Sequence, residues 1–377
     1  MNIGIDASSL VYGRGVSRYT RNLITALSQK PEIELSLYGY SLRRSRQLKS
    51  ELRKIVKNSR HQLQVQTIPP KLQSLLWSLG LNKVKKNFSQ INLFHSWDWL
   101  QPPDKNLPLV STIHDLAILK YPKTAHPRVV KAHQKSWKVL KDRQAHIIAV
   151  SQATKQDVID LLDFPSYRVH VIPEALPQEI RQVSEQLTED KYEFIKQQLD
   201  LAKPYLLFVG TREPRKNLKK IIKAWQPLAA DYQLLVVGES GWDQLDNKAL
   251  NQPNLRFLGR VSDEKLNVLY AEAELFVYAS LYEGFGLPIL EAFYHGTPVV
   301  TSNISAMIEV AGNAAELVDP ESAVSIRNGI FSILNESEAE QRKRLQRMII
   351  RLQMFDWDKV ADQTIKVYRQ ALNDFQD

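Results

Sequence analysis

Short apolar runs alternate with longer helical stretches along nearly the whole chain, and this alternation constrains the fold more than any other feature. A strand, a helix and a second strand in succession imply parallel pairing, because the helix carries the chain back across the sheet. The strands expected in the first half are residues 3–5, 33–37, 91–94, 109–113, 147–150 and 169–172. The pattern restarts with expected strands at residues 205–209, 233–237, 255–257, 275–277 and 298–300. The chain therefore predicts an α/β protein with two Rossmann-like parallel sheets.

The length of the chain agrees with two domains. Its 377 residues are about twice the size of a typical domain, and 44% hydrophobic and 24% charged residues suit a protein with buried cores. A polar segment punctuated by prolines separates the two series of strands near residues 175–200. We expect one domain at 1–177, a second at 178–354, and an amphipathic C-terminal helix at 355–377.

Three absences in the sequence bear on the compartment. No apolar run approaches the roughly 20 residues that a membrane-spanning helix needs. Residues 1–6 enter a strand directly, without the charged and then apolar leader of a secretory signal. The chain has no cysteine, which excludes disulfides and thiolate metal sites. We expect a cytoplasmic protein.

Basic residues are concentrated in the first half. Lys and Arg outnumber Asp and Glu about two to one in residues 1–180, whereas acidic residues are in excess after them. The densest stretch holds eight basic residues between Arg43 and Arg60, and an apolar patch follows at residues 75–77. One interpretation is peripheral contact with anionic lipid at the inner face of the cell membrane. The other is a helix face that is simply solvated.

Residues 280–291, Ser-Leu-Tyr-Glu-Gly-Phe-Gly-Leu-Pro-Ile-Leu-Glu, carry the strongest functional signal. Glu283 is expected on a loop and Glu291 about one turn inside the helix that begins near Pro288. The glycines between them let backbone amides approach a ligand, and a helix N-terminus attracts an anion. Paired surface acids arise by chance, but the Gly-Phe-Gly-Leu-Pro between these two favours function. Carboxylates for hydroxyls and amides for phosphates suit a sugar nucleotide.

A second loop follows the strand that ends at Val209 and reads Gly-Thr-Arg-Glu-Pro-Arg-Lys-Asn over residues 210–217. Two adjacent cations after a glycyl turn, at the start of a helix, suit a pyrophosphate. An isolated basic pair usually faces solvent, but this pair follows a strand in the same domain as the two glutamates. The loop after the first strand has Gly13 and Gly15 without the third glycine of a dinucleotide fingerprint, so a dinucleotide site is a weak alternative.

Together these segments resemble the signature of glycosyltransferase family 4 (group 1), retaining nucleotide-sugar enzymes of the GT-B type. The resemblance covers nearly the whole chain and is strongest at 205–217 and 275–320, where it includes features of mannosyltransferase-like members. It implies two Rossmann-like domains facing a central cleft and a C-terminal helix that returns to the first domain. It also implies transfer of a hexose, with mannose from GDP-mannose as one candidate, to a hydroxyl of a saccharide or lipid-linked saccharide. The family needs no metal or other cofactor, and the leaving phosphate accepts the proton of the acceptor in a same-face attack.

The resemblance assigns roles to individual residues. The catalytic residues that it implies are His114, Glu283, Arg215 and Lys216. The implied donor-binding residues are Gly15, Thr211, Arg260, Val261, Gly284, Phe285, Gly286, Leu287 and Glu291. Weaker candidates for acceptor contacts are His95, Trp97 and Arg18. Thr211 stands where many members have an arginine, so Arg215, or else Arg212, would supply that charge.

Several of these residues also have purely structural interpretations. His114 follows an expected strand, where a buried hydrogen-bonding histidine is equally common. His95 and Trp97 suit a sugar-stacking wall, but aromatic packing is the more frequent role of such residues. Asp356 and Asp358 mimic the acidic triplet of metal-dependent transferases, although Asp356 is better explained as a helix cap.

Two other classes of function stay open. A nucleotide-sugar epimerase on the same fold would isomerise the donor without any acceptor. A polyanion- or membrane-binding module would bind anionic surfaces without using a donor, but it leaves Glu283 and Glu291 unexplained. Nucleic acid is not an expected partner.

Overall fold

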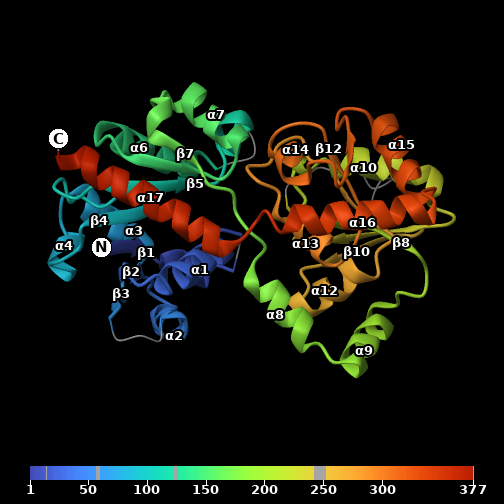
Figure 1. The fold of residues 1–377 in the computed structure, drawn as a ribbon, viewed down its shortest axis with the longest axis horizontal. Helices are drawn as coiled ribbons and strands as arrows, with labels where there is room; N and C mark the ends of the chain where they lie inside the picture. Colours follow the sequence, from blue (N-terminus) through green and yellow to red (C-terminus); the bar gives the residue numbers. More distant parts are fainter. Residues whose placement is uncertain (14, 57–59, 123–125, 242–251, 377) are drawn as a thin grey trace. The chain divides into compact units, whose positions relative to one another are not determined.

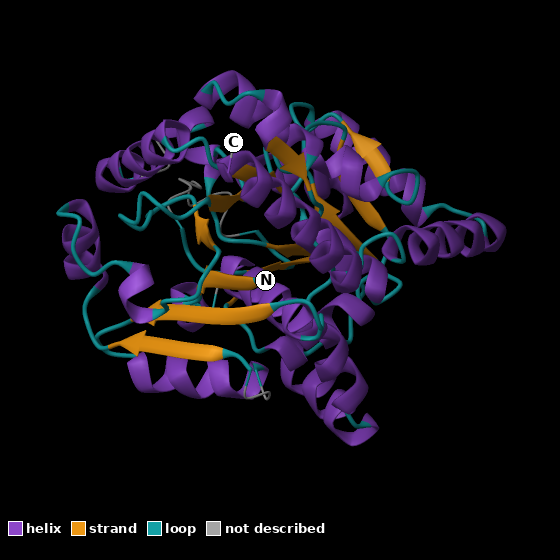
Figure 2. Cartoon of the chain, turned by 60° about the vertical axis from the view of Figure 1, so that its left-hand side comes forward, coloured by secondary structure: helices purple, strands orange, loops and turns teal. Residues whose placement is uncertain are grey.

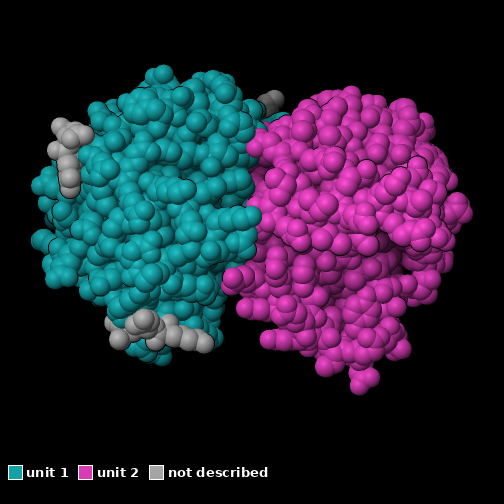
Figure 3. All heavy atoms as spheres, in the orientation of Figure 1, with its two compact units in different colours: residues 1–174, 356–377 teal, residues 175–355 magenta. Residues whose placement is uncertain are grey.

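The computed structural model describes residues 1–13, 15–56, 60–122, 126–241 and 252–376. The chain divides into two compact units, which are coloured separately in Figure 3. Unit 1 comprises residues 1–174 and 356–377, and unit 2 comprises residues 175–355. Both ends of the chain therefore belong to unit 1, as Figure 1 shows.

Unit 1 is built on a parallel sheet with seven strands in the described residues, in the order β3-β2-β1-β4-β5-β6-β7. The strands are β1 (Asn2–Asp6), β2 (Glu34–Tyr40), β3 (Gln62–Gln66), β4 (Leu93–Trp97), β5 (Leu109–Ile113), β6 (His146–Ala149) and β7 (Val169–Val171). The helices around them are α1 (Gly15–Ser28), α2 (Ser45–Ile55), α3 (Pro70–Ser78), α4 (Val84–Asn87), α5 (Ala117–Lys120), α6 (Pro127–Asp142), α7 (Gln152–Leu162) and α17 (Trp357–Gln376). The strand order reverses between β1 and β4, where sheets of this kind bind ligands.

Unit 2 repeats the plan with a parallel sheet whose described strands follow the order β10-β9-β8-β11-β12-β13. Its strands are β8 (Tyr205–Val209), β9 (Gln233–Val237), β10 (Leu255–Gly259), β11 (Leu275–Tyr278), β12 (Val299–Ser302) and β13 (Glu316–Val318). Its helices are α8 (Gln178–Gln186), α9 (Glu189–Leu199), α10 (Leu218–Trp225), α12 (Asp263–Ala271), α13 (Leu287–Tyr294), α14 (Ala306–Ala311), α15 (Ala323–Leu334) and α16 (Glu338–Leu352). Figure 2 shows helices, in purple, beside the strands, in orange.

The two parallel sheets predicted from the apolar runs are confirmed, but each sheet has an edge strand that the pattern missed. β3 reads Gln-Leu-Gln-Val-Gln, and β13 is three residues long, so neither forms a continuous apolar run. Both pair with a neighbour on one side. Edge strands are buried less completely, and the apolar signal is correspondingly weak.

The predicted apolar patch at residues 75–77 is wrong for one of its members. Trp77 is buried in the core of unit 1, where its ring stacks on Tyr38 with centroids 5.7 Å apart. Its indole nitrogen donates to the carbonyl of Asn82 at 3.0 Å. Leu75 on the same helix is 54% exposed. Helical geometry explains the difference, because residues two positions apart lie on different faces.

The C-terminal helix α17, red in Figure 1, is tied to unit 1 along its length. The Asp356 carboxylate caps it as predicted, accepting from the amide of Asp358 at 2.9 Å. The Tyr368 hydroxyl lies 2.7 Å from His95 Nδ1, with both side chains buried. Near its end, Asp374 Oδ2 lies 3.0 Å from His146 Nε2.

The described residues contain no group of three or more His, Asp or Glu side chains that could hold a metal ion.

Candidate functional site

The two motif loops of unit 2 lie beside each other. Residues 210–217 follow β8 and residues 279–286 follow β11, and these parallel strands are neighbours in the sheet. The backbone amide of Leu281 donates to the carbonyl of Arg215 at 2.7 Å, so the loops are joined directly. Because the carboxyl ends of parallel strands share one edge, the charged groups of both loops meet there.

A buried charge cluster, formed by Glu213, Arg215, Lys216, Tyr278 and Glu283, joins the loops. Glu283 accepts from Arg215 Nη1 and from Lys216 Nζ, each at 2.7 Å. Arg215 also pairs with Glu213 at 2.7 Å, and Lys216 Nζ lies 3.0 Å from the Tyr278 hydroxyl. The structure thus brings together three of the four expected catalytic residues, Arg215, Lys216 and Glu283.

Opposing forces set the charge states in this cluster. Burial by itself would raise the pKa of Glu283, but the charges of Lys216 and Arg215 outweigh it and lower that pKa to about 2. Burial lowers the pKa of Lys216, although the nearby Glu283 carboxylate opposes this change. Glu283 is therefore an ionised acceptor throughout the physiological range, held between two cationic side chains.

Glu291 lies where the sequence predicted it, inside α13. The helix starts after Gly286 and has Pro288 in its first turn. Gly286 has a φ of 109°, a conformation that favours glycine. The Glu291 side chain is buried, and its Oε2 accepts a hydrogen bond from the Tyr270 hydroxyl at 3.1 Å. The Ser305 hydroxyl donates to the carbonyl of Glu283 at 2.8 Å and so supports the loop before α13.

Two further glycines, which the sequence analysis missed, pack against the loop after β8. A Cβ on Gly238 would lie 2.1 Å from the carbonyl oxygen of Gly210, and one on Gly241 would lie 2.1 Å from that of Arg212. The backbone after β9 therefore packs directly against the backbone after β8. The glycines at both ends of Gly-Glu-Ser-Gly, immediately after a strand, were the signal for this close approach.

Of the remaining predicted residues of unit 2, Thr211, Gly284 and Phe285 belong to these loops, whereas Arg260 follows β10. The guanidinium of Arg212 lies over the Phe257 ring at 5.0 Å, so the charge cluster contains Arg215 instead. Arg260 is largely exposed, 3.6 Å from Glu239. The half-buried residues at these positions are Thr211, Val261 and Leu287, and the buried ones are Gly284 and Phe285.

In unit 1, His114 follows β5 and pairs with an acid that the sequence reasoning missed. Its Nδ1 lies 2.9 Å from Glu174 Oε1. Its Nε2 is buried and has no hydrogen-bond partner among the described residues. The ring packs edge-on against Tyr19, with centroids 4.7 Å apart. Burial lowers the pKa of His114, but the hydrogen bond and charge of Glu174 outweigh it, so that the pKa is raised. The position of Glu174, shortly after the last strand of the first series, was the available signal.

His95 and Trp97 lie inside unit 1. The two ring nitrogens of His95 lie 2.7 Å from the Tyr368 hydroxyl and 2.9 Å from the Thr112 hydroxyl. Burial lowers the pKa of His95 to about 3. Trp97 is fully buried and donates from its indole nitrogen to the carbonyl of Asp6 at 2.7 Å. These contacts match the packing interpretation of both side chains and leave neither exposed to an acceptor.

Gly15 and Arg18 lie on the first turn of α1, the α-helix that follows β1 in the chain. Gly15 begins α1, and a Cβ added there would meet no atom within 4 Å. Arg18 is half-buried on the first turn of the same helix. Asp6, which the sequence reasoning did not select, ends β1 with Oδ2 buried and unpartnered among the described residues. Burial raises the pKa of Asp6 to about 6.

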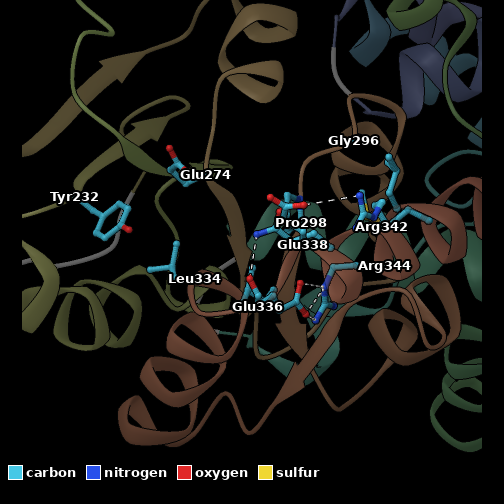
Figure 4. Close-up of a pocket in the computed structure, with 13 residues that line it drawn as sticks. Tyr232, Glu274, Gly296, Pro298, Leu334, Glu336, Glu338, Arg342 and Arg344 are labelled. Atoms are coloured by element: carbon cyan, nitrogen blue, oxygen red, sulfur yellow. Dashed lines mark hydrogen bonds and ion pairs between the residues drawn. The ribbon is translucent and has the colours of Figure 1, made fainter.

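A cavity of about 470 Å³ in unit 2 lies at the amino ends of the strands, opposite the ends that the motif loops follow (Figure 4). Tyr232, Glu274 and Pro298 line it, each just before a strand. Arg344 and Glu336 face each other within it, with Arg344 Nε 2.9 Å from Glu336 Oε1. The residues that line this cavity include none of the predicted site residues.

The His114–Glu174 pair predicts a measurable titration. Replacing Glu174 by Gln removes the charge that opposes burial, so we expect the pKa of His114 to fall below the ordinary histidine value. In the wild type the protonated pair stabilises the fold below the ordinary pKa, and this contribution is lost as pH rises through the raised pKa. NMR titration of labelled histidine measures both values, and Glu51→Gln, which removes an acid from α2, is the control. An unchanged His114 pKa in Glu174→Gln would contradict the pairing.

Comparison with known proteins matches both halves of the chain. Residues 190–350 match the family Glycosyl transferases group 1, and residues 13–178 match Glycosyltransferase Family 4. The chain is 34% identical to O-antigen chain mannosyltransferase B of Escherichia coli over 273 residues, which are 69% of this chain and 70% of that protein. It is 29% identical to the serotype-specific mannosyltransferase WbdA of Escherichia coli over 247 residues, covering 63% of this chain and 30% of that protein.

A solved structure supports the fold. HepE of Anabaena, in complex with UDP and glucose, superimposes with a TM-score of 0.70 at 18% identity, covering 98% of this chain and 100% of that one. At this sequence identity, the similarity shows that the two proteins share a fold. Together with the family matches and the 34% identical relative, it establishes the assignment. The chain belongs to the group 1 glycosyltransferases of glycosyltransferase family 4 and has their GT-B fold of two Rossmann-like parallel-sheet units.

Proposed function

We propose that this protein is a retaining glycosyltransferase that moves a hexose from a nucleoside-diphosphate sugar to a hydroxyl of a saccharide or lipid-linked saccharide. The observation that carries the proposal is the buried charge cluster on the loops after β8 and β11. Mannose, with GDP-mannose as donor, is the proposed sugar, because the two relatives described above are mannosyltransferases. A role in polysaccharide synthesis is proposed as well, because the first of these relatives is an O-antigen chain mannosyltransferase.

Lys216 and Arg215 are proposed to bind the donor diphosphate. A lysine ammonium has three N–H donors and a guanidinium five, so both can contact phosphate oxygens while they keep their bonds to Glu283. The N-terminus of α13 adds partial positive charge at the same edge of the sheet. Negative charge grows on the diphosphate as the sugar leaves, and these groups would stabilise it without reorganisation.

Glu291 is proposed to accept from the ribose hydroxyls, and Glu283 to orient the donor sugar together with the amides of residues 284–287. Both carboxylates are buried, which makes their hydrogen bonds to hydroxyl groups stronger than bonds in water. The low pKa of Glu283 keeps it ionised as an acceptor. Roles for Gly15, Arg18 and His114 in substrate binding or catalysis stay predictions from the resemblance.

The transfer reaction is tested with purified protein, a panel of nucleoside-diphosphate hexoses and saccharide acceptors. We expect donor to be consumed in the presence of acceptor, and NMR of the product to show that the anomeric configuration of the donor is kept. EDTA should leave the rate unchanged, because Lys216 and Arg215 supply the neutralising charge. Loss of activity with EDTA and rescue by Mg²⁺ or Mn²⁺ would contradict metal independence. Isomerised donor without acceptor would identify an epimerase instead.

Variants of the cluster test the proposed donor contacts. We expect Lys216→Ala and Arg215→Ala to lower kcat/KM at least about tenfold, which corresponds to about 1.4 kcal/mol of transition-state stabilisation. Arg212→Ala is the matched control, because its guanidinium lies over Phe257 rather than in the cluster. Thermal unfolding of each variant separates lost activity from lost folding.

Glu291→Ala is expected to lower kcat/KM by a similar factor, because the ribose hydroxyls lose their acceptor. A folded Glu291→Ala variant with near wild-type kinetics would refute the proposed role of Glu291.

We also propose that unit 1 contacts anionic membrane peripherally. Of the basic residues between Arg43 and Arg60, Lys57 lies outside the described residues, and Arg44 and Arg60 donate to backbone carbonyls. The remaining ones include four that line one face of α2, namely Arg46, Lys49, Arg53 and Lys54. None of the described helices is long and apolar enough to cross a bilayer.

Exposed leucines of unit 1 add an apolar part to the proposed contact, which the sequence placed only roughly. The leucines on and just after α3 are exposed by 40%, 54%, 63% and 52%, at Leu72, Leu75, Leu79 and Leu81. The first three are spaced by three and four residues and so share one face of a helix. Exposed lysines stand on both sides of them, at Lys71, Lys83, Lys85 and Lys86. Leucines flanked by cations suit the interface of an anionic bilayer.

Liposome flotation tests this contact. We expect binding to anionic vesicles but not to neutral ones, and loss of binding in high salt, because each cation contributes about 1 kcal/mol within a Debye length of roughly 8 Å. Arg46→Glu with Lys49→Glu should weaken binding, and so should Leu75→Ser with Leu79→Ser. Reversal of Lys135 and Lys138 on α6 is the control. Equal behaviour toward both kinds of vesicle would refute the proposal.

A further inference from the structure

The carboxylate of Glu291 is held from a neighbouring helix. Tyr270 belongs to α12, and its hydroxyl donates to Glu291 Oε2 at 3.1 Å. The two residues are 1% and 6% exposed. A buried carboxylate needs hydrogen-bond donors to offset its lost hydration, and each donor also fixes its orientation.

The ring of Tyr270 is itself fixed in place. It packs edge-to-face against Phe276, with centroids 5.3 Å apart, and stacks on the imidazole of His295 at 5.5 Å. The Thr297 hydroxyl donates to the backbone carbonyl of Tyr270 at 2.6 Å. Because packing sets the position of the ring, the hydroxyl is already placed before any ligand binds.

His295 ties the backbone of Glu291 to the same helix. Its Nδ1 lies 2.8 Å from the carbonyl oxygen of Glu291, and its Nε2 lies 2.7 Å from Asn267 Oδ1. Asn267 is on α12, where its Nδ2 donates to the carbonyl of Asp263 at 2.8 Å. α12 therefore holds both the carboxylate and the backbone of Glu291.

From this arrangement we infer that Tyr270 is a positioning residue for the nucleotide. Its hydroxyl holds the Glu291 carboxylate in the orientation that accepts the 2′ and 3′ hydroxyls of the ribose. A carboxylate has about four lone-pair sites, so one bond from Tyr270 leaves acceptor capacity for both hydroxyls. The inference rests on the proposed function, in which Glu291 binds the ribose.

Tyr205 provides a matched control for a purely structural role. It lies on β8, is 1% exposed, and donates from its hydroxyl to the carbonyl of Leu269 in α12 at 2.8 Å. Like Tyr270, it anchors α12 through a buried hydroxyl. Its bond ends on the backbone of α12 rather than on Glu291. Tyr205→Phe therefore removes a comparable bond without touching the carboxylate.

The experiment measures binding of UDP and GDP by isothermal titration calorimetry, and of their 2′,3′-dideoxy counterparts, which lack the ribose hydroxyls. The ribose form is whichever of UDP and GDP the wild type binds more tightly. We expect Tyr270→Phe to weaken binding of this ribose form about tenfold, because a hydrogen bond to a charged group is lost. Binding of the dideoxy form should not change. Tyr205→Phe should change neither. The phenylalanine ring preserves the packing, and thermal unfolding verifies that each variant is folded.

The outcomes separate this inference from the function on which it rests. If Glu291→Ala leaves binding of the ribose form intact, the proposed role of Glu291 fails. If Glu291→Ala weakens binding but Tyr270→Phe does not, the role of Tyr270 alone is overturned. Equal weakening of the ribose and dideoxy forms by Tyr270→Phe would show a structural role and overturn it as well. In the Glu291→Ala background, we expect Tyr270→Phe to have no further effect on nucleotide binding.

Discussion

The pairing of the buried Glu283 carboxylate with Lys216 and Arg215 is the interaction on which the site depends. An ionised group inside a protein is costly unless opposite charge and hydrogen bonds compensate it, and losing one partner leaves the other buried and uncompensated. Here the partners come from different loops, so the same bonds that neutralise the charge also hold the loops after β8 and β11 together. The backbone bond from Leu281 to Arg215 and the close approach of Gly238 to Gly210 fix the cationic loop from two more sides.

Local features of the sequence predicted the two sheets and three residues of the charge cluster, Arg215, Lys216 and Glu283. Continuous apolar runs marked the inner strands, and the Gly-Phe-Gly-Leu-Pro segment placed Glu283 before α13 and Glu291 within it. The choice between Arg215 and Arg212 needed the structure, because both follow the same strand and their side chains leave the loop in different directions. The edge strands β3 and β13 were missed because a strand that is partly exposed has little apolar periodicity.

The sequence analysis did not pair residues that are distant along the chain. Glu174 meets His114 across 60 residues and Tyr270 meets Glu291 across 21, and neither pair forms a local motif. His95 and Trp97 show the same limit from the other side. Packing was expected as their more frequent role, but nothing local indicated that α17, more than 250 residues later, would cover His95 through Tyr368. Periodicity identifies a strand, but which element packs against it is a property of the whole chain.

The return of α17 to unit 1 has a consequence for how the chain acquires its structure. In the described part of the chain, unit 2 is inserted between the seven strands of unit 1 and α17, the helix that completes unit 1. The bond between His95 and Tyr368 closes a separation of 273 residues. During synthesis, the strands of unit 1 leave the ribosome long before α17 does, and unit 2 can fold in the interval. Once unit 2 is compact, it shortens the effective loop that α17 must close. A folded unit 2 therefore lowers the entropic cost of docking α17 onto the sheet of unit 1.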